Sequence, residues 1–198
     1  MGRDRNAGAL EPFPEGCTRL NQTHQGGVVR HPLTRRAIAS LLAAAAAPAI
    51  AAPGLPKPTR APILTVSGKI GVFNEGNTAQ FDRQMLEGIG MTSFTTTTPW
   101  YDRPVTFEGP PMTRLMQTVD ARGDTVTAVA LNDYITEIPL SDFARHGVIL
   151  ALKRDGVYMP VRDKGPLFIV YPYDNDPNLN HRRYYSRSAW QVARLIVN

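Results

Sequence analysis

The chain has 198 residues, with 22 lysines and arginines against 17 aspartates and glutamates, and a single cysteine. The first 51 residues hold six of the basic and three of the acidic side chains, so the remainder carries a net charge of only +2. This small charge excludes the strongly basic surface of a typical nucleic-acid-binding protein. Because the cysteine is Cys17, the sequence after residue 51 has no thiol for a disulfide or a metal.

An export signal is predicted near the N-terminus. Arg35 and Arg36 precede an uncharged, alanine-rich run from Leu41 to Ala52, which is the pattern of a twin-arginine signal. The run is shorter than the about 20 apolar residues of a membrane-spanning helix. We therefore assign the region 33–52 to a twin-arginine signal peptide, with the cleavage itself expected after Ala51, so that Ala52 begins the mature chain. We expect a periplasmic protein with no membrane insertion after processing.

The regions on either side of this signal have different expected roles. Residues 1–32 show no hydrophobic periodicity, which predicts either a disordered extension or a start codon placed too far upstream. Residues 53–62 contain four prolines and read as a linker. Residues 63–198 are long enough to form a single domain with one hydrophobic core.

The first part of this domain combines strands with two short helices. Ile63–Ile70 alternates apolar and polar residues and predicts a strand. Phe81–Ile89 and Met112–Val119 place apolar residues at helical spacing and predict two amphipathic helices. Met91–Thr98 is rich in β-branched residues and predicts a second strand. Tyr101–Pro104 has the chemistry of a turn, and a short extended piece follows it.

The second part of the domain is dominated by strands. Segments rich in apolar and β-branched residues predict strands at Thr125–Leu131, Ile135–Pro139, Gly147–Arg154, Val157–Val161, Leu167–Pro172 and Gln191–Val197. The uniformly apolar strand after Gly147 is expected to be buried on both faces, and Asp155-Gly156 predicts a hairpin turn. A one-turn helix begins at Leu140 with Ser141 as its cap, and 173–181 is a loop. Many strands with few helices indicate an α+β domain with a mixed sheet.

The segment Phe94–Trp100 is the first candidate for a binding site. Its last threonine is held in an extended conformation by the proline that follows it. The hydroxyls of Thr96, Thr97 and Thr98, next to the indole of Trp100, would suit a flat heterocycle that forms hydrogen bonds. The alternative is an edge strand that leaves Trp100 in the hydrophobic core.

Further candidate residues follow later in the chain. Asp133 could pair with the amino-pyrimidine edge of a heterocycle, with Tyr134 beside it; alternatively, Asp133 is a turn residue bonded to its own backbone. Four basic side chains could form a cluster that holds an anionic tail or faces an acidic partner, and the alternative is a solvated surface. These are Lys164, Arg182, Arg183 and Arg187. His146 and His181 have no ligand partners at metal-like spacing, so no metal site is expected.

Several short motifs occur in a characteristic order. They are Phe107-Glu108-Gly109-Pro110-Pro111, Ala130–Tyr134, Ile149–Ala151 with Asp155-Gly156, Lys164–Leu167, Tyr171-Pro172 and Ser188–Gln191. This order resembles the oxidoreductase molybdopterin-binding domain family, over roughly Ile63–Val197. The resemblance implies a mixed-sheet, sulfite-oxidase-like α+β fold with a pterin site at the end of the sheet.

Two departures from the family pattern concern its cofactor. In the enzymes of this family a cysteine thiolate ligates molybdenum. The position of that cysteine would correspond to a residue in or near Thr95–Thr98, a segment that has no cysteine in this chain. The enzymes also tend to carry an arginine for the cofactor phosphate where this chain has Phe168. Because threonine hydroxyls do not replace a soft thiolate ligand, we expect a reduced pterin of unknown tail, no molybdenum and no catalytic residues.

Within this family the chain looks most similar to small exported proteins that lack the cysteine. The resemblance implies a non-catalytic, periplasmic protein that senses a pterin. Its partner would be the periplasmic region of a membrane protein that makes or degrades cyclic di-GMP. One alternative is a molybdopterin-dependent oxidoreductase with a non-cysteine metal ligand. Another is a structural or interaction domain with an empty pocket.

Overall fold

Alternating hydrophobic residues build the largest sheet. The computed structural model describes residues 54–198, so the predicted extension and signal peptide lie outside the described residues. The five strands of this sheet are, in spatial order, β2 (Ala79–Phe81), β1 (Leu64–Gly68), β11 (Val192–Val197), β5 (Thr125–Ala130) and β6 (Ile135–Pro139). β1 runs parallel to β11, whereas the other neighbours are antiparallel. The prediction of a mixed sheet is therefore confirmed.

Two smaller sheets complete the β structure. The four-stranded sheet contains, in spatial order, β3 (Thr92–Thr98), β4 (Tyr101–Gly109), β8 (Lys153–Arg154) and β9 (Val157–Tyr158). β7 (Ile149–Ala151) pairs with β10 (Phe168–Val170), and every residue of these two strands is buried. The strand predicted to be buried on both faces is thus confirmed where it pairs as β7.

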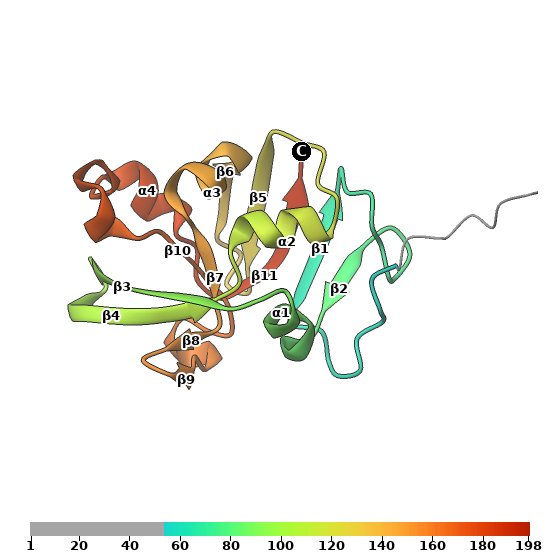
Figure 1. Ribbon diagram of the computed structural model, residues 1–198, viewed down its shortest axis with the longest axis horizontal. Coiled ribbons are helices and arrows are strands. Elements are labelled where there is room, and N and C mark those ends of the chain that lie inside the picture. Colours follow the sequence, from blue (N-terminus) through green and yellow to red (C-terminus); the bar gives the residue numbers. More distant parts are fainter. Residues whose placement is uncertain (1–53) are drawn as a thin grey trace, which may run out of the picture. The chain divides into compact units, whose positions relative to one another are not determined.

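The helices are short and cover one side of the large sheet. They are α1 (Arg83–Gly88), α2 (Met112–Thr118), α3 (Leu140–His146) and α4 (Arg182–Arg187). Figure 1 shows α2 lying in front of β1, β5 and β11. The buried face of α2 consists of Met112, Leu115 and Met116, which join the main core together with the inward residues of the sheet. None of the helices within residues 54–198 is long and apolar enough to cross a bilayer.

A close approach of backbones joins β4 to β7. The N–H of Leu150 donates to the carbonyl of Pro110 at 2.9 Å, and that of Leu152 donates to Glu108 at 2.8 Å. A Cβ atom on Gly109 would collide with the carbonyl of Leu150. Glycine at position 109 is what allows the two strands to lie this close.

Three sequence predictions are wrong because long-range pairing overrides local pattern. Phe81 does not start a helix; it is fully buried in β2 opposite Leu64, and α1 begins only after Asp82. Tyr101 is not in a turn but begins β4, where it pairs with Thr98. Ser141 is exposed inside a longer helix α3 and does not cap it.

The predicted loop after β10 has local structure of its own. It contains two 3₁₀ turns, η2 (Tyr173–Asn175) and η3 (Pro177–Leu179). The basic and aromatic segment that follows forms α4, which the sequence pattern did not predict. Residues 54–198 all fall within one compact unit, so the described structure is a single α+β body.

Candidate ligand pocket

Four of the six residues that line a cavity of about 220 Å³ are aromatic. This cavity lies where the β3–β4 turn, the β5–β6 turn and α4 with the residues after it come together. We call it the aromatic pocket. Its lining residues are Trp100, Asn132, Tyr134, Tyr185, Ser188 and Trp190. Two of the predicted site residues, Trp100 and Tyr134, therefore meet in one cavity although they come from different turns.

Trp100 both packs on the core and lines the aromatic pocket. Its ring makes edge-to-face contacts with Phe168, Tyr173, Tyr185 and Trp190 at centroid distances of 5.5, 6.3, 6.1 and 5.6 Å. Such T-shaped contacts are favourable because the positive edge of one ring meets the negative face of another. The indole is half-buried, so it packs against the core and also forms part of the pocket wall.

The β5–β6 turn places Asn132 and Tyr134, but not Asp133, in the wall of the pocket. Asp133 is exposed, with φ of 62°. Tyr134 donates a 2.8 Å hydrogen bond from its hydroxyl to the carbonyl of Ser186 on α4. Asn132 accepts a bond from the backbone of Tyr134 at 3.3 Å, and its side-chain NH₂ has no partner within residues 54–198. Sequence reasoning missed Asn132, although it stands directly before the predicted Asp133.

The three predicted threonines support the pocket without lining it. Thr96 is buried; its hydroxyl accepts from the N–H of Asp174 at 3.1 Å and donates to the carbonyl of Thr97. Thr97 bonds to the Asp174 carboxylate through its N–H and its hydroxyl. The hydroxyl of Thr98 accepts from the N–H of Trp100 at 3.3 Å. These hydroxyls thus hold the turn that carries Trp100.

The four predicted basic residues have different surroundings. The Lys164 ammonium lies 4.9 Å from the ring centre of Tyr101 and 5.8 Å from that of Trp190, so it lies beside the pocket. Arg182 and Arg183 are exposed at the start of α4. Arg187 forms a 2.7 Å ion pair with the buried Asp142.

Two separate sets of buried hydrogen bonds hold Arg187 and Ser188, and Ser188 is part of the pocket wall. The Tyr171 hydroxyl donates to Asp142 at 2.9 Å, on the same carboxylate oxygen that Arg187 binds. The hydroxyls of Tyr173 and Ser188 bond to each other at 2.5 Å. Burial raises the pKa of Tyr171 and the pKa of Tyr173 above the ordinary tyrosine value. Both tyrosines therefore remain neutral hydrogen-bonding groups at physiological pH.

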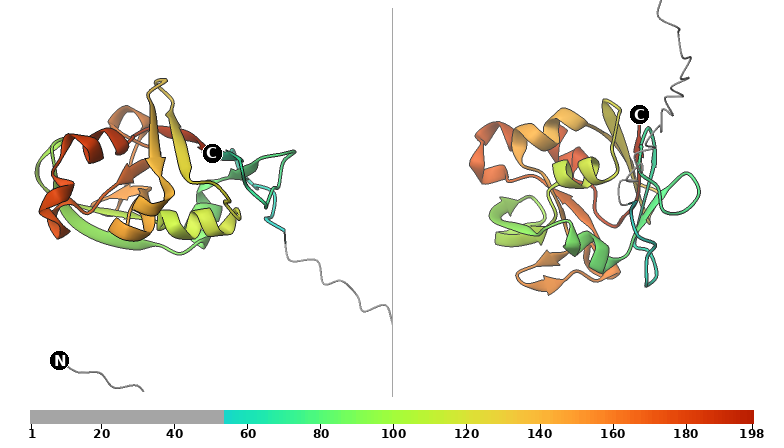
Figure 2. Two further views of the ribbon diagram at one scale, coloured as in Figure 1. Left: turned by 90° about the horizontal axis from the view of Figure 1, so that it is seen from above. Right: turned by 45° about the vertical axis from the view of Figure 1, so that its right-hand side comes forward.

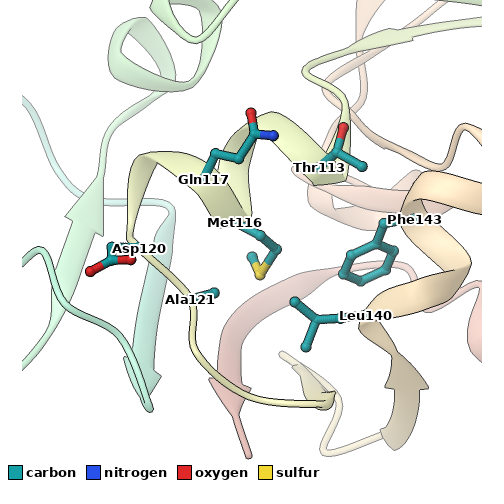
Figure 3. Close-up of a pocket in the computed structure, with 7 residues that line it drawn as sticks. All are labelled: Thr113, Met116, Gln117, Asp120, Ala121, Leu140 and Phe143. Carbon is teal, nitrogen blue, oxygen red and sulfur yellow. The ribbon is translucent and has the colours of Figure 1, made fainter. Parts of the chain in front are cut away.

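Three other cavities are larger, but each is lined by at most one aromatic residue. The one of about 350 Å³, beside β1 and β11, has none. Figure 3 shows one of about 380 Å³ between α2 and α3, where Met116, Leu140 and Phe143 face one another. Its one charged lining residue, Asp120, is paired with Arg122. The other cavity, of about 460 Å³, is lined by charged groups such as Arg154, which already binds Tyr101 and Asp163.

Comparison of the chain with models of known protein families and with curated proteins found no match. Within residues 54–198, no group of three or more His, Cys, Asp or Glu side chains is placed to hold a metal ion.

Proposed function

We propose that this chain is a non-catalytic, periplasmic pterin-binding protein with a sulfite-oxidase-like fold. In this proposal it senses a reduced pterin and regulates a membrane enzyme of cyclic di-GMP signalling. The observation that carries the proposal is the aromatic pocket, whose lining combines four aromatic rings with the side-chain NH₂ of Asn132, which has no partner within residues 54–198.

The lining residues suit a flat, bicyclic heterocycle. Stacking on an aromatic ring is worth about 0.5–1.5 kcal/mol beyond the burial of area. The amide of Asn132 can exchange two hydrogen bonds with an amino-pyrimidinone edge, as asparagine does with the edge of adenine. A cavity of about 220 Å³ is below the range of about 300–1,000 Å³ for drug-sized ligands. It therefore suits the pterin ring with the tail outside, near Lys164.

The residues present fit a pterin better than they fit molybdenum. The lining contributes indole, phenol, amide and hydroxyl groups, whereas the family's metal is held by a thiolate. The threonines at the expected cysteine position direct their hydrogen bonds to Asp174, the carbonyl of Thr97 and the N–H of Trp100. This donor set supports binding of the ring without redox chemistry.

The β5–β6 turn could couple ligand binding to a change at the protein surface, because it contacts both the pocket and α4. Asn132 and Tyr134 line the pocket, and Tyr134 also bonds to α4 through Ser186. A ring bound between these elements would change how firmly the turn and the helix are held together. A partner protein that binds the exposed surface of the turn and of α4 would then respond to this change.

Ligand binding is tested by titrating the purified full-length protein with tetrahydrobiopterin under anaerobic conditions. Quenching of the chain's two tryptophans, Trp100 and Trp190, reports occupancy of the pocket. We expect Asn132→Ala and Tyr134→Ala to weaken binding about tenfold or more. Tyr158→Ala is the matched control, because Tyr158 is 39% exposed against 43% for Tyr134 but lies on β9, outside the pocket. Equal binding by all three variants would reject the pocket.

The regulatory role is tested separately, in cells of the source organism. Replacing the chromosomal copy with the Asn132→Ala variant should change the cellular level of cyclic di-GMP as much as deleting the gene does. If the variant loses the pterin and the level of cyclic di-GMP is unchanged, the protein binds a pterin for another purpose. Recovery of stoichiometric molybdenum in the purified protein would instead favour the oxidoreductase alternative.

A further inference from the structure

A second cavity, of about 350 Å³, lies beside the first residues of β1 and of β11. Segments that are far apart in the sequence form its apolar wall, which contains Pro62, Ile63, Leu131, Val161 and Pro166. We call this cavity the apolar groove. Leu131 and Val161 are 54% and 52% exposed, and Leu131 lies in the turn of the β5–β6 hairpin, which stands out from the body (Figure 2). Because apolar surface is driven out of water, the groove would hold a molecule with an apolar part.

Gln191 joins two of the segments that form the apolar groove. Its carbonyl accepts a 2.9 Å hydrogen bond from the N–H of Leu131. Its side-chain NH₂ donates a 2.6 Å bond to the carbonyl of Val161, and its own N–H donates to the carbonyl of Lys164 at 3.2 Å. The wall is therefore held in place before any molecule enters the groove, and such preorganisation lowers the entropic cost of binding.

One positive charge stands at the apolar groove. Of the ten described residues that line it, Arg194 is the one that is charged. Its side chain is exposed and forms no ion pair within residues 54–198. Thr65 lies directly opposite Arg194 in the parallel pairing of β1 with β11, so the Thr65 hydroxyl can donate a further hydrogen bond at the same place. Since a guanidinium binds a carboxylate through two parallel hydrogen bonds, this position suits an anionic group.

The lining of the apolar groove disfavours the other common classes of ligand. The ten described lining residues include no aromatic ring to stack on a flat heterocycle and no carboxylate to pair with a cation. Pro62 and Pro166 lack backbone N–H groups, so their part of the wall cannot donate hydrogen bonds to a sugar. The volume of about 350 Å³ is at the lower end of the range of about 300–1,000 Å³ for ligand pockets. Together these features select a short aliphatic chain with one negative charge.

We propose that the apolar groove binds a medium-chain aliphatic carboxylate. The chain lies against Leu131, Val161 and the prolines, and the carboxylate binds Arg194 and Thr65. No residue of the described chain lines both this groove and the aromatic pocket. The site is therefore separate from the one proposed for a pterin, and its test contains no pterin, so either proposal can fail without the other.

The test is calorimetric titration of the full-length protein with octanoate, below the concentration at which octanoate forms micelles. We expect saturable binding, with the amide signals of Thr65 and Arg194 shifting in nuclear magnetic resonance spectra. Octanol has the same chain without the charge, and octylammonium reverses the charge. Both should bind about tenfold more weakly or worse. Equal binding of all three compounds would mean that they adsorb to apolar surface without a specific site, and would overturn the proposal.

A matched pair of substitutions locates the site. Val161→Asp should weaken octanoate binding about tenfold or more, because it places a negative charge in the apolar wall. The control is Val157→Asp, the same change at a position that is 69% exposed but lies on β9, outside the groove. This control should bind octanoate like the unmodified protein.

Reversing the charge at position 194 tests where the carboxylate binds. Arg194→Glu should bind octylammonium more tightly than octanoate, and such a reversal of preference cannot arise from misfolding. Circular dichroism checks that Val161→Asp is folded. Unchanged binding of octanoate by both Val161→Asp and Arg194→Glu, or no saturable binding by the unmodified protein, overturns the proposal.

Discussion

The backbone N–H of Thr97 donates a 2.7 Å hydrogen bond to one oxygen of Asp174, and the Thr97 hydroxyl bonds to the other oxygen of the same carboxylate. The two residues are 77 positions apart in the chain, so this contact ties the end of β3 to η2. It also fixes the turn that carries Trp100. We expect Asp174→Ala to lower the free energy of unfolding by about 1–2 kcal/mol, measured by chemical denaturation.

The control for this contact is Asp102→Ala, because Asp102 is exposed and makes no side-chain hydrogen bond within residues 54–198. That change should leave stability within about 0.5 kcal/mol. Combining Asp174→Ala with Thr97→Val should cost less than the sum of the two single changes, since both remove the bond between the Thr97 hydroxyl and the Asp174 carboxylate. Full additivity would show that the bond between the Thr97 hydroxyl and Asp174 contributes nothing to stability.

The Arg187–Asp142 ion pair is expected to be essential for stability. Asp142 is buried, and Arg187 and the Tyr171 hydroxyl are its side-chain partners within the described chain. Removing the arginine leaves a buried carboxylate without its counter-charge, so Arg187→Ala should cost about 3–5 kcal/mol. Arg182→Ala, on the exposed side of the same helix, should cost less than about 0.5 kcal/mol. Urea unfolding of both variants decides whether Arg187 is structural or available to a ligand.

Asp82 should make stability depend on pH in the acid range. Its carboxylate accepts bonds from the N–H groups of Met85, Thr59 and Arg60. These bonds, that from Met85 above all, hold the pKa of Asp82 below its ordinary value. The stabilisation is therefore fully present above the pKa of the unfolded chain and is lost as pH falls toward the lower pKa of the folded protein.

We expect Asp82→Asn to cost about 1–2 kcal/mol at neutral pH. The difference between the unmodified chain and this variant should shrink as pH falls below the ordinary aspartate pKa of about 3.9. Urea unfolding of both proteins over this pH range provides the measurement. A difference that stayed constant with pH would mean that the charge of Asp82 has no part in holding residues 59–60 against α1.

The hydroxyl of Tyr134 is expected to restrain the β5–β6 turn against α4. Tyr134→Phe keeps the ring in the aromatic pocket but removes the bond to Ser186, at a cost of about 0.5–1.5 kcal/mol. Amide hydrogen exchange should become faster in the turn and in α4. Tyr158→Phe, which removes a bond to Glu87, should instead affect α1 and β9. Unchanged exchange in α4 would contradict the role given to this bond.

Gly109 should not tolerate a side chain. A methyl group there would collide with the carbonyl of Leu150, so Gly109→Ala should destabilise the protein by about 1–3 kcal/mol. Gly88 provides the matched control, since no atom lies near its missing Cβ and it belongs to α1. Gly88→Ala should be neutral or stabilising by up to about 1 kcal/mol. Thermal unfolding of both variants distinguishes a tight contact from a general intolerance of substitution.

Local patterns predicted the strands whose side chains alternate or are uniformly apolar. β1, β3, β5, β6 and β11 all lie within the ranges expected from their residues. The turn at Asp155-Gly156 also holds, because Asp155 and Gly156 both adopt positive φ, at 49° and 79°. The alternation of side chains along a strand is visible in consecutive residues, so no knowledge of distant contacts is needed to recognise it.

The patterns misled where a residue's partner lies far along the chain. Phe81 has helical spacing to Met85, yet pairing with Leu64 makes it part of β2. Tyr101 resembles a turn residue, yet it pairs with Thr98 and extends β4. The segment of α4 has no amphipathic pattern, and none of its residues is fully buried. Its last residue nonetheless pairs with the buried Asp142 of α3.

The same distinction between local patterns and distant contacts applies to the residues of the candidate pocket. Trp100 and Tyr134 could be chosen from the sequence because each follows residues with hydrogen-bonding groups, the threonines before Trp100 and Asp133 before Tyr134. Asn132, Tyr185, Ser188 and Trp190 join them only after three segments, separated by dozens of residues, have folded together. Composition and periodicity thus establish an α+β domain rich in strands, since both depend on local backbone preference. The aromatic pocket depends on strand order and register, which no short stretch of residues encodes.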